Sequence, residues 1–84
     1  MPPLADRHIR AMRVAVDQGR TTAIRASRAL GVTRSAAGGA LRALERAGYL
    51  HGELVGGGEV GYSVTAAGRA WLQDRSSTQS RANR

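Results

Sequence analysis

The sequence predicts an α+β fold that is mainly helical, with three helices, a β-hairpin and a C-terminal helix in that order. Apolar residues recur every three or four positions before Gly48, which is typical of helices, and every second position over residues 49–64, which is typical of strands. Gly19, Gly31 and Gly48 stand where the successive helices would end. With 84 residues, the chain has room for one small globular domain, which we assign to residues 1–76.

The first helix is expected over residues 4–18, with Gly19 as its C-terminal stop. Its apolar positions, at spacings of four, three and four, would share one buried face: Ala5, Ile9, Met12 and Val16. Three basic side chains fall elsewhere on the helical wheel and would form a solvated face: Arg7, Arg10 and Arg13. The second helix is shorter, over residues 23–30, and either Thr21 or Thr22 would cap its N-terminus.

The second helix ends at Gly31, and only the turn Gly31-Val32-Thr33 separates it from a third helix. Thr33 is the expected N-cap of this third helix, and Gly48 is its expected stop. A buried stripe follows the helical spacing: Ala37, Ala40, Leu41 and Leu44. Two helices joined by a turn of a glycine, an apolar residue and a capping residue are the signature of a helix-turn-helix.

Residues 49–64 predict a hairpin of two antiparallel strands, because apolar or small residues alternate with others on both sides of a glycine cluster. The cluster, Gly56-Gly57-Gly58-Glu59, would form a flexible hairpin tip. Thr65 would cap a last helix that carries Trp71 and Leu72. We expect the polar residues 77–84 to form a disordered tail outside the domain.

The charge of the chain is high and unevenly distributed. Thirteen basic residues, all of them arginine, stand against six acidic ones, which gives a formal net charge of +7. Residues 1–48 carry nine arginines and three acids, whereas residues 49–72 carry one arginine and two acids. A phosphate backbone favours clustered arginine through charge contacts and counterion release. The first 48 residues therefore predict binding to a polyanion.

The composition disfavours several other classes of function. The chain has no cysteine, and its two histidines, His8 and His51, are too few to build a metal site alone. Neither histidine has a nucleophile held by a third group, and so small a core leaves no room for a deep substrate cleft. No apolar run approaches the ~18 residues that a membrane span needs. We expect no enzymatic activity, no cofactor, no metal and no membrane contact, in a cytoplasmic protein associated with the nucleoid.

Four successive pieces of the chain combine into one pattern. They are RALGVTRS at residues 28–35, LRALERAGYL at 41–50, the hairpin, and VTAAGR at 64–69, where Thr-x-x-Gly-Arg opens the helix after the hairpin. This pattern resembles that of the small bacterial winged-helix regulators of the MarR type. The resemblance covers about residues 22–72 and implies a winged-helix fold, in which the hairpin is the wing.

The resemblance implies that the third helix lies in the major groove of double-stranded DNA and that the wing follows the neighbouring backbone or minor groove. It also implies a small transcriptional regulator that could form a homodimer on a two-fold site. Binding is expected to be sequence-directed, and the residues expected to contact DNA are Thr33, Arg34, Ser35, Gly38, Gly39, Arg42, Arg25 and Arg28. Arg34 and Arg42 would reach bases or phosphates, whereas the arginines of the second helix would hold the DNA backbone.

Three features keep other functions open. The pair Gly38-Gly39 removes two side chains that usually read bases, and each glycine lowers helix stability by about 1 kcal/mol relative to alanine. The wing has no arginine, and Glu59 at its tip would be repelled by phosphate. Arg42 and Arg46 could also pair with Glu45 on the helix surface. The alternatives are a winged-helix module that binds another protein, and a DNA-binding factor of replication, a plasmid or a phage without sequence preference. No small-molecule effector is evident.

Overall fold

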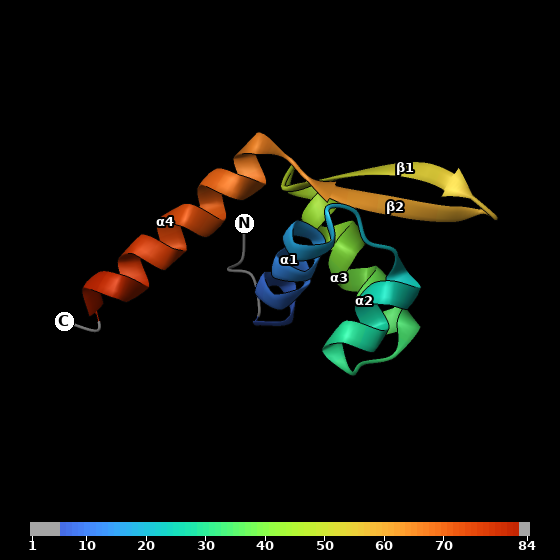
Figure 1. Cartoon of the computed structure of the whole chain (residues 1–84), viewed down its shortest axis with the longest axis horizontal. Coiled ribbons are helices and arrows are strands. Elements are labelled where there is room, and N and C mark those ends of the chain that lie inside the picture. The colour runs from blue at the N-terminus through green and yellow to red at the C-terminus, as the bar shows by residue number, and fades with distance from the viewer. Residues whose placement is uncertain (1–5, 83–84) are drawn as a thin grey trace.

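The computed structural model describes the backbone of residues 6–82 and the side chains of residues 6–74. Its elements are, in chain order, α1 (Asp6–Gln18), α2 (Ala23–Leu30), α3 (Arg34–Arg46), β1 (Leu50–Gly56), β2 (Glu59–Val64) and α4 (Ala66–Ala82). The first three helices pack together, the two strands project from one end of them, and α4 runs away in the opposite direction (Figure 1). The predicted fold class, α+β and mainly helical, is confirmed.

The three packed helices enclose a small core that is rich in alanine. Met12, Leu41 and Leu44 are its largest fully buried apolar side chains. The remaining buried apolar residues are Ala11, Ala15, Ala26, Ala37, Ala40, Leu50 and Tyr62. The stripe predicted for α3 is confirmed, because all four of its residues are at most 4% exposed. With this face held in the core, the opposite face of α3 is left in solvent.

The helix α1 buries a different face from the one that its larger apolar residues indicate. Ala11, Met12 and Ala15 are fully buried, whereas Val16 is 38% exposed and Ile9 is half-buried. The prediction of a buried face is therefore correct for Met12 and wrong for Val16. Residues 4 and 5, which the prediction also included in the helix, lie outside the described part of the chain. Alanine permits the closest approach between helices, so the contact with the neighbouring helices is centred on the two alanines.

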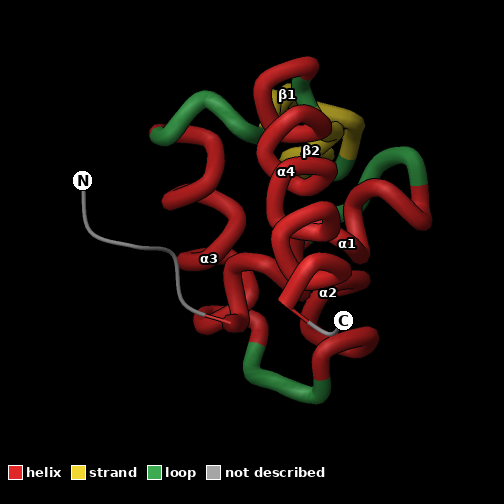
Figure 2. Tube along the Cα trace, turned by 90° about the vertical axis from the view of Figure 1, so that its left-hand side faces the viewer, coloured by secondary structure: helices red, strands yellow, loops and turns green. Residues whose placement is uncertain are grey.

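The strands β1 and β2 form the predicted hairpin. They pair antiparallel, with Leu50 opposite Val64 at the base and Gly56 opposite Glu59 at the tip. The three tip glycines, residues 56–58, have φ angles of 115°, 60° and 76°, which only glycine adopts freely in so tight a turn. Both strands lie together at one end of the helices (Figure 2).

One contact that has no local signature in the sequence ties this hairpin to the helices. Thr21, in the loop between α1 and α2, is fully buried and pairs with Tyr62 of β2. The Thr21 amide donates to the Tyr62 carbonyl at 2.9 Å, and the Tyr62 amide donates to the Thr21 carbonyl at 2.7 Å. Thr21 thus acts as a one-residue third strand that fixes the direction of the wing, and Thr22 is the residue that caps α2.

The C-terminus of α3 is a junction to which β1 and α4 are both attached. Gly48 has a φ of 86°, and the Tyr49 amide donates to the Leu44 carbonyl at 3.0 Å, so α3 ends in a left-handed turn. The Thr65 hydroxyl donates to the Gly48 carbonyl at 2.7 Å and accepts from the Gly68 amide at 3.1 Å. The Thr65 amide donates to the Tyr49 carbonyl at 3.1 Å. Thr65 therefore caps α4, as predicted, and fastens it to the end of α3.

Gly68 is needed because the first turn of α4 lies directly against the peptide group of Tyr49. A β-carbon at position 68 would clash with the Tyr49 carbonyl oxygen and would lie 2.9 Å from Cγ1 of Val64. One turn further, the rings of Tyr49 and Trp71 stack with their centroids 5.5 Å apart. The Thr-x-x-Gly segment of the sequence thus has a packing role.

The helix α4 extends beyond the position at which we expect the domain to end. It continues to Ala82, through residues 77–82, where the sequence indicates a disordered polar tail. Neither glycine nor proline occurs after Gly68, so nothing in the chain interrupts the helix once Thr65 has capped it. Residues 83 and 84 lie outside the described part of the chain.

We expect Gly68→Ala to lower the free energy of unfolding by about 1–3 kcal/mol, because the added methyl group overpacks a contact with a hydrogen-bonded backbone oxygen. The matched control is Gly39→Ala in α3, where a β-carbon would meet nothing within 4 Å. This control should gain up to about 1 kcal/mol from higher helix propensity. Urea denaturation followed by circular dichroism measures both values, and equal stabilities of the two variants would contradict the role given to Gly68.

Candidate nucleic-acid interface

The helices α2 and α3 are joined by the capping interactions that the sequence predicts. At the start of α2, the Thr22 hydroxyl accepts from the Arg25 amide at 3.2 Å. Gly31 ends α2 with a φ of 69° and a ψ of 33°, in the left-handed region. The Thr33 hydroxyl then accepts from the Ala36 amide at 3.1 Å and begins α3. The helix-turn-helix is therefore positioned by hydrogen bonds within its own sequence.

The helix α3 presents one side to solvent, because the stripe on its other side is buried. The exposed residues of α3 and its cap that lie outside the wing contact form what we call the α3 face: Thr33, Arg34, Ser35, Gly39, Arg42 and Arg46. Gly38 is not part of it, since this residue is half-buried and its β-carbon would lie 3.7 Å from Cβ of Ala23 in α2. Five of the six residues predicted on α3 and its cap thus share one accessible surface.

The arginines of the α3 face have no partner within residues 6–74. Arg34, Arg42 and Arg46 make no hydrogen bond and no ion pair in that part of the chain. Glu45, the acid considered as their partner, instead accepts a hydrogen bond from the Gly52 amide at 3.1 Å. Three guanidinium groups are therefore available to an anionic partner. The DNA-contacting residues predicted from the sequence do not include Arg46, although its spacing of four from Arg42 places both on the same side of a helix.

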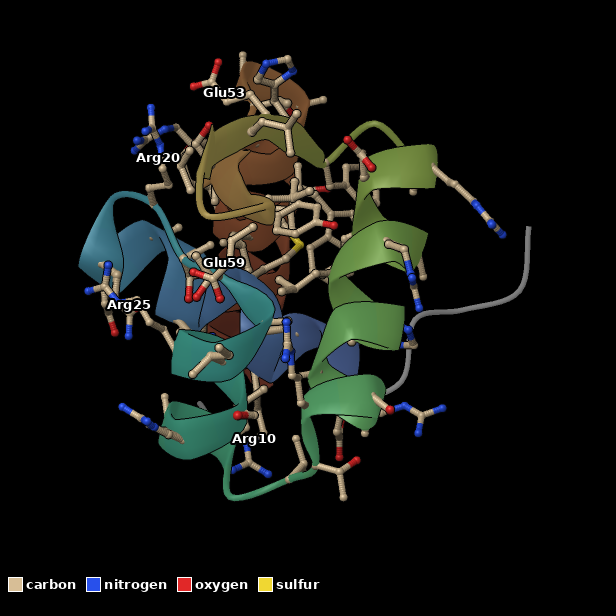
Figure 3. All side chains as sticks on the ribbon, turned by 90° about the vertical axis from the view of Figure 1, so that its right-hand side faces the viewer. Arg10, Arg20, Arg25, Glu53 and Glu59 are labelled. Atoms are coloured by element: carbon tan, nitrogen blue, oxygen red, sulfur yellow. The ribbon has the colours of Figure 1, made fainter. Side chains whose placement is uncertain are left out.

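The two candidate arginines of α2 differ in their surroundings. The Arg25 guanidinium donates to the Arg20 carbonyl at 3.4 Å, so it is partly engaged within the chain. Arg28 is exposed and makes no hydrogen bond or ion pair among the described side chains. Arg20, which the sequence analysis did not single out, forms an ion pair with Glu53 of β1 at 2.8 Å (Figure 3). These two residues are 33 positions apart, so no local pattern indicates their pairing.

The wing is firmly attached at its base but carries little positive charge. Tyr62 is buried there, and burial raises the pKa of its phenol; the Glu45 carboxylate adds to this rise, and Arg42 opposes it. No arginine occurs in residues 50–64. Glu59 belongs to the tip (Figure 3), and Leu54 of β1 is 75% exposed. The surface of the wing is thus apolar and acidic.

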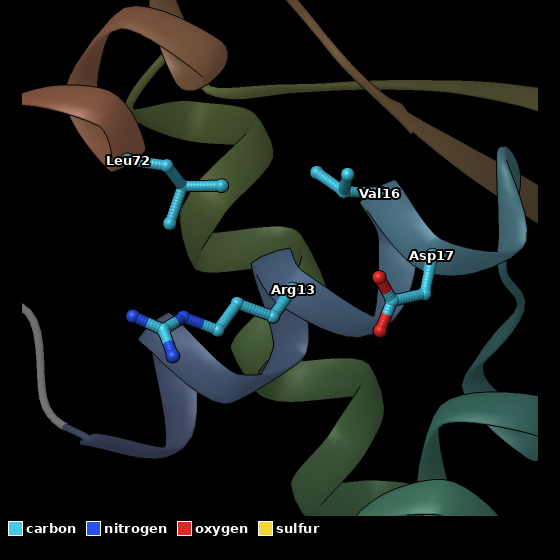
Figure 4. A pocket seen from close by; sticks show the side chains of 4 residues that line it. All are labelled: Arg13, Val16, Asp17 and Leu72. Carbon is cyan, nitrogen blue, oxygen red and sulfur yellow. The ribbon is translucent and has the colours of Figure 1, made fainter. Parts of the chain in front are cut away.

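A second surface feature lies between α1 and α4. A pocket of about 220 Å³ is lined there by Arg13, Val16, Asp17 and Leu72 (Figure 4). No residue of the α3 face contributes to it.

Among the described residues, no helix is long and apolar enough to cross a membrane. The same part of the chain holds no group of three or more metal-ligating side chains.

The sequence matches no protein-family model and no curated protein. Solved structures resemble its fold. BpsR of Bordetella bronchiseptica, whose DNA binding is regulated by 6-hydroxynicotinic acid, has a TM-score of 0.80 and 17% identity over 93% of this chain and 56% of its own. A MarR-family protein of Bacillus stearothermophilus has a TM-score of 0.82 and 15% identity, over 96% of this chain and 57% of its own. A MarR-family regulator of Rhodococcus sp. RHA1 has a TM-score of 0.82 and 20% identity, over 95% of this chain and 58% of its own.

These similarities show that the chain has the winged-helix fold of MarR-family transcriptional regulators. The expected arrangement of helix-turn-helix, wing and following helix is confirmed. Identities of 15–20% support a statement about the fold alone. The chain spans 56–58% of the length of the three solved proteins, a little more than half of each.

We expect Thr33→Ala to lower the free energy of unfolding by about 1 kcal/mol, because the N-terminus of α3 loses the hydroxyl that caps the Ala36 amide. Thr33→Ser keeps a capping hydroxyl and should stay within about 0.5 kcal/mol of the wild type. Thermal unfolding followed by circular dichroism compares the three proteins. A Thr33→Ala variant as stable as the wild type would show that this cap does not support the helix-turn-helix.

Proposed function

We propose that this chain binds double-stranded DNA by placing α3 in the major groove, and that it acts as a small transcriptional regulator. The α3 face carries the proposal, because it combines an exposed helix surface with three arginines that have no partner within residues 6–74. The major groove of B-DNA admits an α-helix, and guanidinium groups bind guanine edges and phosphates. The winged-helix fold shared with MarR-family regulators supports the same function.

The distribution of charge supports the same orientation. Nine of the thirteen arginines lie in residues 1–48, against three acids, and this part of the chain forms the helices α1, α2 and α3. The region that forms the wing has a small negative charge. A positive helical surface attracts DNA from a distance and binds it through released counterions. The approach to DNA is therefore led by the helices.

Five of the six residues of the α3 face have a proposed role. Arg34 and Arg42 contact guanine edges or phosphates, and the Ser35 hydroxyl donates to a phosphate or a base edge. Thr33 acts first as a cap. Gly39 leaves room for the helix backbone to lie close to the DNA, since no side chain stands there.

The residues outside the α3 face have supporting roles in this proposal. Arg28 holds the DNA backbone, and Arg25 does so less strongly because its guanidinium already donates to a backbone carbonyl. Gly38 faces α2, where its β-carbon would lie 3.7 Å from Cβ of Ala23, so we assign it no contact with DNA. The wing contributes little, because it has no arginine and Glu59 repels phosphate. Sequence preference, where present, then depends mainly on arginine.

The same function implies an oligomeric state and a cellular location for the protein. We infer a homodimer on a two-fold DNA site, with half-sites about 10–10.5 base pairs apart or a multiple of that distance. The proposed protein is not an enzyme, needs no cofactor, and works in the cytoplasm at the nucleoid. BpsR responds to 6-hydroxynicotinic acid, but no feature of the described residues selects a small-molecule effector for this chain.

One observation favours a second candidate function. Leu54 and Val55 of the wing are 75% and 40% exposed, and an apolar, acidic hairpin is suited to contact another protein. In that case the chain is a winged-helix interaction module.

A third candidate is DNA binding without sequence preference. Selection of bound oligonucleotides from a random pool separates this candidate from a sequence-directed regulator, because only the latter enriches a motif.

We expect the Arg34→Ala and Arg42→Ala double variant to weaken binding to duplex DNA. The slope of log affinity against log salt is negative and should become less steep by about 1.8, because each lost phosphate contact removes about 0.9. If one of the two arginines contacts a base instead, the slope changes less, and the variant loses affinity mainly for the preferred sequence. Fluorescence anisotropy of a labelled duplex over a series of salt concentrations measures both quantities.

Arg13→Ala is the matched control for this experiment. Arg13 is an exposed arginine of α1 that lines the pocket facing α4, so its loss should leave the affinity and the salt slope close to those of the wild type. Absence of duplex binding by the wild type at low salt would contradict the proposed function. The control removes one charge and the double variant removes two, so the same weakening per removed charge in both proteins would show that net charge, rather than the α3 face, governs binding.

A further inference from the structure

The side of α3 that faces the first turn of α1 forms a pocket of about 270 Å³. Its lining comes from two helices that are far apart in the sequence: Arg7, His8, Ser35, Ala36, Gly39 and Ala40. Ser35 and Gly39 also belong to the α3 face, so this α1–α3 pocket opens beside the surface that is proposed to enter the major groove.

Arg7 gives the α1–α3 pocket a positive charge that is not neutralised within it. The side chain is exposed and makes no hydrogen bond or ion pair among residues 6–74. Asp6, its acidic neighbour in the first turn of α1, does not line the pocket. A guanidinium group presents several N–H donors in a planar fork that matches the oxygens of a phosphate. The exposed Ser35 hydroxyl supplies a further donor across the pocket.

Gly39 keeps the pocket open. A β-carbon built at this position would meet nothing within 4 Å, so the packing of the described residues does not require a glycine here. A glycine inside a helix nevertheless lowers stability by roughly 0.5–1 kcal/mol relative to alanine. Because Gly39 has no side chain, it leaves space in the pocket beside Arg7, and a bound group could occupy that space.

We propose that the α1–α3 pocket binds a phosphate of the DNA backbone, with Arg7 as its cationic ligand and Ser35 as a hydroxyl donor. This inference rests on the proposed function, because the phosphate belongs to the duplex held by α3. It extends the DNA interface from the helix-turn-helix to α1, where the sequence indicates only a solvated face. A phosphate contact at α1 also supplies the positive flank that the acidic wing does not provide.

The test compares three single variants of Arg7 and Arg13 in duplex binding over a series of salt concentrations. Arg7→Ala should make the negative slope of log affinity against log salt less steep by about 0.9, the value for one lost phosphate contact. The accompanying loss of affinity at low salt is on the order of tenfold. Arg7→Lys keeps the charge and should retain most of the slope. Arg13→Ala removes the same charge from the same helix but from a different pocket, and should keep the slope of the wild type.

The outcomes separate this inference from the proposed function. If the wild type binds no duplex, both are overturned. If Arg34→Ala weakens binding while Arg7→Ala matches Arg13→Ala in slope and affinity, the proposed function stands and the phosphate site at α1 is overturned. If Arg7→Lys behaves like Arg7→Ala, the charge of the side chain is not what matters, and the assignment of a phosphate ligand is also overturned. Circular dichroism spectra confirm that all variants are folded, as expected for exposed side chains.

Discussion

The junction at Gly48 and Tyr49 is the constraint on which the arrangement of the other elements depends. These two residues lie between the end of α3 and the start of β1, and the hydroxyl and amide of Thr65 attach the start of α4 to their carbonyl groups. The contact between Gly68 and the Tyr49 peptide leaves no room for a side chain, so α4 can leave the body in one direction only. The pairing of Thr21 with Tyr62 fixes the remaining element, the wing. Short backbone contacts, rather than a large core, thus define the geometry of this small domain.

That geometry explains how so small a domain holds one side of α3 in solvent. The alanine-rich core holds α3 by one side, and the caps at Thr22, Gly31 and Thr33 set its position relative to α2. The side left in solvent carries arginines without partners in the described structure, whereas the acids near the wing are already engaged, Glu45 by the Gly52 amide and Glu53 by Arg20. Arginines without an ion-pair partner among the described side chains therefore lie on all three packed helices, and three of them lie on the α3 face.

Local features of the sequence predict most of the fold, because caps, glycine stops and apolar stripes act over a few residues. The helix-turn-helix, the buried stripe of α3 and the Thr65 cap all follow from such signals. The pairing of Thr21 with Tyr62 and of Arg20 with Glu53 joins distant segments and leaves no periodic trace. The buried face of α1 depends on which small residues its neighbours approach, which explains the error at Val16. The exposed side of α3 follows from the helical spacing of its buried stripe, whereas the position of Arg7 beside α3 depends on the tertiary contact between α1 and α3.

The most direct test of this account is a chemical-shift map of the amide groups of the ¹⁵N-labelled protein as a mixed-sequence duplex is added at low salt. The account predicts that the largest changes fall on the first half of α3, around Ser35 and Gly39, and on the first turn of α1 at Arg7. The amides of the wing tip and of the pocket between α1 and α4 should change little. Changes confined to the wing or to that pocket, with α3 unaffected, would contradict the central claim that α3 is the DNA-binding element.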